Sequence, residues 1–148
     1  MKKYNFLLVF ICTVLFSCSK EKKFENRLEG NSFSVTITID GDLIYKDEKM
    51  SFNECKNAKE LCRGSWVYIG NQADFYWRFS NKAKQFELSN ITPTEYGANV
   101  NDQAVKSYKF SGIYDVVSYK KDNRELILKS SQTMGYSGKI VLLYLMQI

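Results

Sequence analysis

The chain contains 148 residues, with 21 Lys and Arg against 16 Asp and Glu, and it contains no histidine. The basic residues are scattered along the chain instead of being gathered into a patch, which argues against nucleic-acid binding. The lack of histidine removes the side chain on which acid–base catalysis, nucleophile activation and zinc binding most often depend.

The first seventeen residues have the three regions of a bacterial secretory signal. Lys2 and Lys3 precede an apolar run over residues 6–16, and Ser17 is a small residue at the expected cleavage point. This run is much shorter than the roughly 20 residues that a membrane-spanning helix needs, so a retained transmembrane anchor is disfavoured. Residues 1–17 are therefore predicted to be a signal peptide.

Cys18 distinguishes this signal from an ordinary secretory signal. Residues 15–18, Leu-Phe-Ser-Cys, resemble the lipobox of bacterial lipoproteins. The resemblance implies cleavage before Cys18, a diacylglycerol on its sulfur and an acyl chain on its amine, and such a set of chains binds a membrane firmly. By the same resemblance, Ser19 at the next position favours the outer membrane of the cell envelope. The sequence leaves open whether the protein faces the periplasm or the cell surface.

The mature chain of 131 residues, 18–148, is long enough for one domain with a hydrophobic core. Without Lys2 and Lys3 it carries 19 basic and 16 acidic residues, a net charge of about +3. Residues 18–29 are polar and charged, and we predict a solvated tether there in preference to a recognition tail. The folded domain is then expected to cover residues 30–148.

Two cysteines, Cys55 and Cys62, remain in the mature chain. An even pair in an exported chain favours a structural disulfide. A zinc site would need four ligands, usually Cys and His, and the two-residue spacing of redox motifs is absent. We therefore predict a disulfide, no metal site and no cofactor.

Alternation of apolar and polar residues with a period of two predicts strands along most of the mature chain. The pattern is clearest over residues 32–40, where Phe33, Val35 and Ile37 face one side. Asp40 and Gly41 are expected to adopt positive φ in a tight turn. Further strand segments are predicted at residues 43–45, 50–52, 65–69, 74–80, 85–89, 107–119, 125–130 and 138–146.

Two later segments bear on how the strands are assembled. Residues 90–105 hold the only proline and are predicted to be a loop of low order. Residues 138–146 are apolar on both faces, so this strand is expected to be paired on both sides and covered, because an exposed apolar edge would aggregate. The prediction is an all-β fold, an antiparallel up-and-down meander of about eight strands closing into a barrel. A β-sandwich remains the alternative, and the irregular alternation disfavours a transmembrane barrel.

Several features occur in an order that resembles a known family. A lipobox, a charged segment, Leu-Glu-Gly at residues 28–30, an Asp-Gly turn and Phe-Asn-Glu-Cys at residues 52–55 follow one another. Together they resemble the small lipocalin-like lipoproteins of Bacteroidetes type over roughly the whole mature chain. Lipocalin-like domains often have a tryptophan two residues after the first glycine, and this chain has Ser32 there with Phe33 beside it. The resemblance implies an eight-stranded barrel with room for an apolar pocket.

No combination of residues predicts catalysis, and we do not expect an enzyme. Residues 135–138, Gly-Tyr-Ser-Gly, lack the glycine spacing of a nucleophile elbow and are predicted to be a turn. The acidic pairs Asp40 with Asp42 and Asp47 with Glu48 are expected at turns, where acidic residues are common.

Two functions from different classes remain. In the first, the barrel binds a small apolar ligand. The candidate lining residues are Trp66, Tyr68, Phe75, Trp77 and Phe79. In the second, these aromatics are simply core side chains and exposed tyrosines dock to an envelope protein, as in an accessory subunit or an immunity-type inhibitor. A vacant cavity open at one barrel end would favour the ligand, and a filled interior with an exposed aromatic patch would favour the protein partner.

Overall fold

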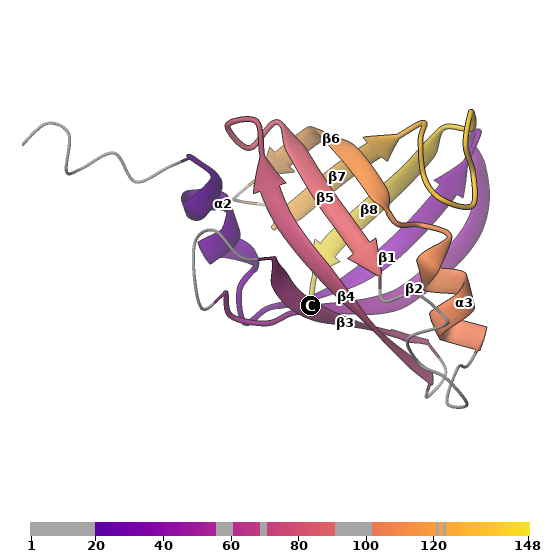
Figure 1. Cartoon of the computed structure of the whole chain (residues 1–148). Coiled ribbons are helices and arrows are strands. Elements are labelled where there is room, and N and C mark those ends of the chain that lie inside the picture. Colours follow the sequence, from indigo (N-terminus) through magenta and orange to yellow (C-terminus); the bar gives the residue numbers. More distant parts are fainter. Residues whose placement is uncertain (1–19, 56–60, 69–70, 91–101, 121, 123) are drawn as a thin grey trace, which may run out of the picture.

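The computed structural model describes residues 20–55, 61–68, 71–90, 102–120, 122 and 124–148. The predicted signal peptide and Cys18 therefore lie outside the described residues. Figure 1 shows a barrel of strands with a short helix near each end. In chain order the elements are α2 (Lys20–Leu28), β1 (Ser32–Ile39), β2 (Asp42–Phe52), β3 (Cys62–Tyr68), β4 (Asn71–Ser80), β5 (Gln85–Asn90), α3 (Asp102–Tyr108), β6 (Gly112–Lys120), β7 (Glu125–Ser130) and β8 (Val141–Gln147).

The strands form one closed antiparallel sheet. Each strand pairs with its neighbours in sequence, and β8 pairs with β1 to complete the barrel. Closure is continuous over seven residue pairs, from Phe33 opposite Gln147 to Ile39 opposite Val141. The prediction of an all-β meander that closes into a barrel is confirmed, and the sandwich alternative is excluded by the β1–β8 pairing.

The first hairpin shows how local sequence fixes the register. Ile39 pairs with Asp42, which leaves Asp40 and Gly41 as a two-residue loop. Their φ angles are +53° and +92°, the left-handed region that Asp tolerates and Gly adopts without strain. Two successive positive φ values suit the right-handed twist of the flanking strands. The predicted tight turn is therefore confirmed.

The core lies inside the barrel and follows the period-two pattern of each strand. Alternate residues of β1, namely Phe33, Val35, Ile37 and Ile39, are buried, whereas the serines and threonines between them are half-exposed. The apolar strand β8 is paired on both sides, by β1 and β7, as predicted. The barrel interior covers its inward side chains, whereas its outward side chains remain partly exposed.

The segment predicted to be a solvated tether is helical from Lys20 onward. Phe24 and Leu28 lie on one face of α2 because they are four residues apart. Leu28 is fully buried, and the Phe24 ring packs against Phe79 and Tyr119 with centroid separations of 5.5 and 4.9 Å. Two apolar residues at helical spacing thus attach this charged segment to the barrel end.

The second helix also differs from the prediction. Of the expected loop over residues 90–105, residues 91–101 lie outside the described part. The structure has α3 at Asp102–Tyr108, and the strand expected from residue 107 begins only at Gly112. Asn90 explains this late start, because its side-chain amide donates to the Ser107 carbonyl at 2.6 Å and to Ser111 Oγ at 3.1 Å. These bonds hold the segment before Gly112 against the end of β5.

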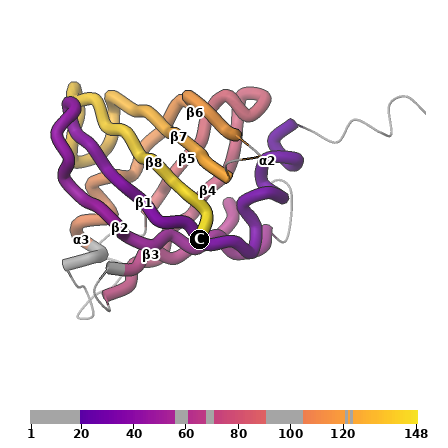
Figure 2. Tube along the Cα trace, turned by 180° about the vertical axis from the view of Figure 1, so that it is seen from behind, coloured from indigo at the N-terminus to yellow at the C-terminus, as the bar shows by residue number. Residues whose placement is uncertain are grey.

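The two helices lie at opposite ends of the barrel. The two views in Figures 1 and 2, turned by 180°, both place α2 beside the end where β1 begins and α3 beside the other end. We call these the α2 end and the α3 end. Among the described residues, neither helix has the length and apolar character required to cross a membrane.

Candidate functional site

The predicted ligand-lining residues are core side chains. Trp66, Phe75 and Trp77 are fully buried, and Phe79 is 4% exposed. The side chain of Tyr68, the fifth candidate, lies outside the described part of the structure. A ring bordering an internal cavity that admits water would keep exposed surface toward that cavity, so the full burial of three of these rings excludes one beside them. The core alternative for these aromatics is therefore the arrangement that the structure has.

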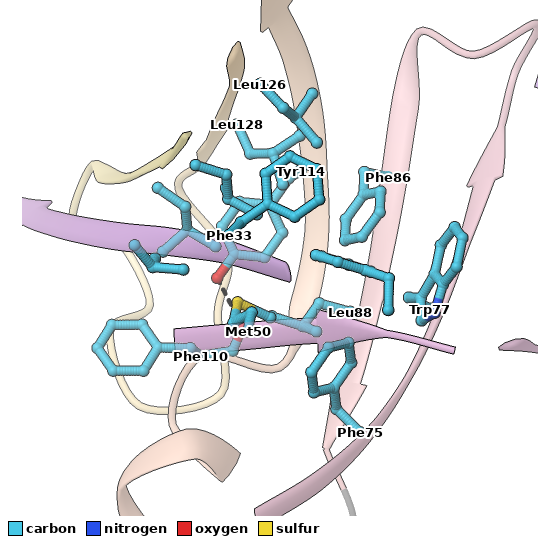
Figure 3. Close-up of a cluster of buried hydrophobic side chains, with 14 of the residues drawn as sticks. Phe33, Met50, Phe75, Trp77, Phe86, Leu88, Phe110, Tyr114, Leu126 and Leu128 are labelled. Carbon is cyan, nitrogen blue, oxygen red and sulfur yellow. Dashed lines mark hydrogen bonds between the residues drawn. The ribbon is translucent and has the colours of Figure 1, made fainter. Parts of the chain in front are cut away.

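Aromatic rings fill the half of the barrel toward the α2 end. Phe52 lies in the middle of this group and makes edge-on contacts with Phe33, Phe75 and Trp77 at centroid separations of 5.2 to 5.5 Å. Such edge-to-face pairs are the arrangement that aromatic quadrupoles favour. Gly64 of β3 makes the packing feasible, because a Cβ there would lie 2.3 Å from the Phe75 ring. Figure 3 shows several of these side chains pointing toward one another across the barrel interior.

Phe110 lies in the half of the barrel toward the α3 end. It lies between α3 and β6, is fully buried and contacts the rings of Tyr45, Trp66 and Tyr136. Its carbonyl accepts a 2.6 Å hydrogen bond from the Tyr114 hydroxyl, drawn as the dashed line in Figure 3. Burial raises the pKa of Tyr114 far above its ordinary value, so this hydroxyl remains a donor. The segment between α3 and β6 therefore fills part of the barrel interior.

A buried ion pair links α3 to the barrel. Glu48 of β2 is 1% exposed, and its carboxylate accepts 2.5 Å hydrogen bonds from Trp66 Nε1 and from Lys106 Nζ. The Lys106 ammonium also lies 4.4 Å from the centroid of the Tyr45 ring. A charged carboxylate in an apolar interior requires such partners, because burying it alone would be very costly. The ion pair therefore links α3 to β2.

The sequence pattern did not predict that Glu48 points into the barrel, because a β-bulge in β2 sets the orientation of this side chain. Val35 pairs with Glu48 and Ile37 pairs with Tyr45, so β2 carries one extra residue in this interval. Asp47, at φ +60°, is exposed, and Glu48 turns inward. The prediction that Asp47 and Glu48 sit at a turn is wrong, since both lie within β2. The signal that the sequence offered was a run of charged residues within an otherwise apolar alternation. The ion-pair partner of Glu48 could not be predicted, because Lys106 lies on a helix that the pattern did not predict.

The other sequence-predicted positions are structural. Cys55 and Cys62 form a disulfide, as predicted, joining the segment after β2 to the start of β3. Residues 135–138 form turns before β8, as predicted, with Gly138 at φ +81°. In the described residues, no group of three or more Cys, His, Asp and Glu side chains could hold a metal ion.

The outer surface carries an apolar face over β6, β7 and β8. Tyr144 pairs with Ile127, so these two outward side chains lie side by side, and Ile127 pairs in turn with Ser118, the residue next to Val117. Tyr144, Met146 and Val117 are 38%, 54% and 57% exposed, and Ile127 and Leu142 are half-exposed. We call these five residues the β8 face. Contiguous exposed apolar surface on a folded domain often marks an interaction site.

The comparisons with known proteins give no family assignment. No protein-family model, curated protein or solved structure matches this chain.

Proposed function

We propose that this chain is a lipid-anchored lipoprotein of the cell envelope whose barrel acts as a protein–protein interaction module. Cys18 carries the acyl chains, and the β8 face docks to an envelope protein. An accessory subunit and an immunity-type inhibitor are the two roles that this proposal covers. The resemblance to lipocalin-like lipoproteins belongs to the same proposal and is supported by the closed meander of eight strands.

The filled interior is the observation that carries the interaction role. Barrels of eight strands either fill with side chains or hold one small ligand. Here the candidate lining aromatics are packed against Phe52 and Phe110, while aromatic and aliphatic side chains of β8 remain outside. The apolar material available to a partner is thus on the outer surface. The polar rim includes Lys129 and the Lys120–Glu125 pair, the kind of border that protein interfaces have.

Two observations support the lipid anchor. The apolar run of residues 6–16 is followed at once by the lipobox ending at Cys18. The Cys55–Cys62 disulfide is the kind of bond that persists in oxidising compartments outside the cytosol.

The anchor is tested by replacing Cys18 with serine in the full chain. We expect the variant to be lost from the membrane fraction or to accumulate unprocessed, and to incorporate no labelled palmitate. A matched variant, Cys12→Ser, lies within the segment that is removed and should fractionate as the natural chain does. Unchanged membrane association and labelling of Cys18→Ser would refute the anchor.

The interaction role is tested with photocrosslinking residues placed one at a time in living cells. We expect a crosslinker at Tyr144 to give one discrete product and one at Tyr76 to give none. Tyr76 is a suitable control because it is an outward tyrosine on β4, four strands away around the barrel, where its ring faces Arg63. Equal products at both positions, or none at Tyr144, would contradict docking through the β8 face.

A further inference from the structure

A polar groove lies at the α2 end, outside the filled interior. It has a volume of about 660 Å³ and lies between α2, the start of β1, the β6–β7 turn and the end of β8. Figures 1 and 2 both show α2 beside this edge of the barrel. The lining residues are Asn26, Arg27, Asn31, Phe33, Tyr119, Lys120, Asp122, Arg124 and Gln147.

Basic side chains dominate the charge of this groove. Arg27, Lys120 and Arg124 line it, against the single carboxylate of Asp122. Lys120 is 3.6 Å from Glu125, whereas no carboxylate of the described residues lies within ion-pair distance of Arg27 or Arg124. Two guanidinium groups are thus available to an anion that enters the groove. Guanidinium groups suit phosphate, because their planar N–H donors can bind two of its oxygens at once.

Arg27 is held in position before any ligand arrives. Its guanidinium carbon lies 5.2 Å from the centroid of the Phe24 ring and 5.5 Å from that of Tyr119. Cation–π contacts of this kind orient the group without neutralising its charge. The hydrogen bond from Gln147 Nε2 to Asn31 Oδ1, 2.7 Å long, joins the chain just after α2 to the end of β8. The groove is therefore bounded by fixed elements and is preorganised for its ligand.

The place of the groove in the chain indicates where its ligand comes from. Lys20 follows Cys18 by two residues, at most about 7 Å of extended chain. Arg27 lies seven residues further, about 10 Å along α2. Lys20, Lys23, Lys82 and Lys84 add positive charge at the same end, where the carboxylate of Glu21 accepts the Lys82 backbone N–H, Glu29 pairs with Lys22 and Glu25 is buried. An acylated Cys18 would therefore hold this groove close to the headgroups of the membrane.

We propose that the α2-end groove binds the phosphate of an anionic phospholipid headgroup through Arg27 and Arg124, with Lys120 beside them. The choice of a lipid as the source of the phosphate rests on the lipid anchor proposed above, whereas anion binding rests on the groove alone. Headgroup binding would orient the barrel on the membrane and set the direction in which the β8 face points.

The test uses the mature chain with Cys18→Ser, so that binding cannot come from the acyl chains. The mature chain contains every residue that the structure describes, so the whole fold is present in this test. Binding is measured by co-sedimentation with phosphatidylcholine vesicles that contain or lack phosphatidylglycerol. We expect Arg27→Gln/Arg124→Gln to weaken binding to the anionic vesicles about thirtyfold, as expected for two basic residues that each contact headgroups. A single Arg124→Gln variant, on an exposed turn, provides a second measurement that does not disturb α2.

The matched control removes the same charge from the α3 end. Lys46, in the first half of β2, and Lys139, just before β8, are exposed there. We expect Lys46→Gln/Lys139→Gln to bind anionic vesicles nearly as well as the parent chain. Equal weakening by both double variants would show general charge attraction and overturn the groove as a site.

A second arm distinguishes a headgroup from a free anion. Glycerol phosphate is expected to compete with anionic vesicles and to shift the NMR signals of groove residues, whereas inorganic phosphate at the same concentration should do so more weakly. Stronger binding of inorganic phosphate, with no vesicle binding, would overturn the headgroup proposal. Because this chain carries no lipid, these outcomes are independent of the fractionation of Cys18→Ser in cells, which tests the anchor by itself.

Discussion

Glu48 is a buried carboxylate that forms an ion pair with Lys106. We predict that Glu48→Gln destabilises the protein by about 3 kcal/mol, because Lys106 would keep its charge in a largely buried position without a carboxylate. Urea unfolding followed by tryptophan fluorescence measures this directly, since Trp66 donates to the same carboxylate. The double variant Glu48→Gln/Lys106→Met should recover most of the loss. A single variant as stable as the parent would show that the pair contributes nothing.

Glu25 differs from Glu48, because burial of Glu25 disfavours the charged form of its carboxyl group. Desolvation raises the pKa of Glu25 above its ordinary value, although a hydrogen bond from the Phe79 backbone and the nearby Lys22 ammonium lower it. When the pKa of a carboxyl is higher in the folded protein than in the unfolded chain, the folded protein loses stability as pH rises from the unfolded pKa through the folded one.

Replacing Glu25 with glutamine should therefore stabilise the protein more at neutral than at acidic pH. The glutamine keeps an acceptor for the Phe79 N–H and removes the charge. We expect the difference in Tm between variant and parent to become more positive between about pH 4 and about pH 7. Glu54→Gln, at an exposed position, should show no such trend. A constant difference across this range would contradict the assignment.

At the scale of elements, the disulfide limits the freedom of the chain between β2 and β3. Cys55 and Cys62 are seven positions apart, and their Cα atoms are separated by 4.8 Å. Closing so short a loop is expected to contribute about 2 to 3 kcal/mol by restricting the unfolded chain. Cys55→Ser should lower the free energy of unfolding by that amount, and a reductant should lower the parent to the same level. Identical melting of the oxidised and reduced parent would remove this role.

Helix α2 should also contribute to stability, because it is packed against the barrel. Phe24 contacts the rings of Phe79 and Tyr119 but is only partly buried. We expect Phe24→Ala to cost about 2 kcal/mol, less than the roughly 3–5 kcal/mol of a fully buried phenylalanine. Lys23→Ala, at the neighbouring exposed position, is the control. If both variants unfold at the same denaturant concentration, α2 does not stabilise the barrel.

The strands could be predicted from sequence more successfully than the helices, for a physical reason. In β1 the alternation of apolar and polar residues follows directly from the environment of each residue, because one face of the strand lies on the core and the other faces solvent. Helices α2 and α3 have nine and seven residues, too few to be stable in isolation, so their helicity depends on contacts with the barrel. Those contacts involve residues distant in sequence, such as Phe79 for α2.

The same limit applies to the interior of the whole molecule. The sequence placed Phe75, Trp77 and Phe79 on one inward face, and the structure buries all three. Alternation cannot distinguish a lined cavity from a filled one, because both require apolar side chains facing inward. In the structure, Phe52 and Phe110, which come from other elements, pack against Trp77 and Trp66 in the interior.

Because those two rings occupy the interior, the intact protein should hold no apolar ligand there. Native mass spectrometry of the purified mature chain with Cys18→Ser is expected to show the mass of the polypeptide alone. Phe52→Ala removes the ring at the centre of the aromatic group, and an apolar cavity of this kind stays dry and accepts benzene or xenon. We therefore expect that variant, if folded, to be stabilised by benzene while the parent is unaffected. A lipid or other apolar molecule recovered stoichiometrically with the parent would instead require the core to open, and would favour ligand binding over the interaction module.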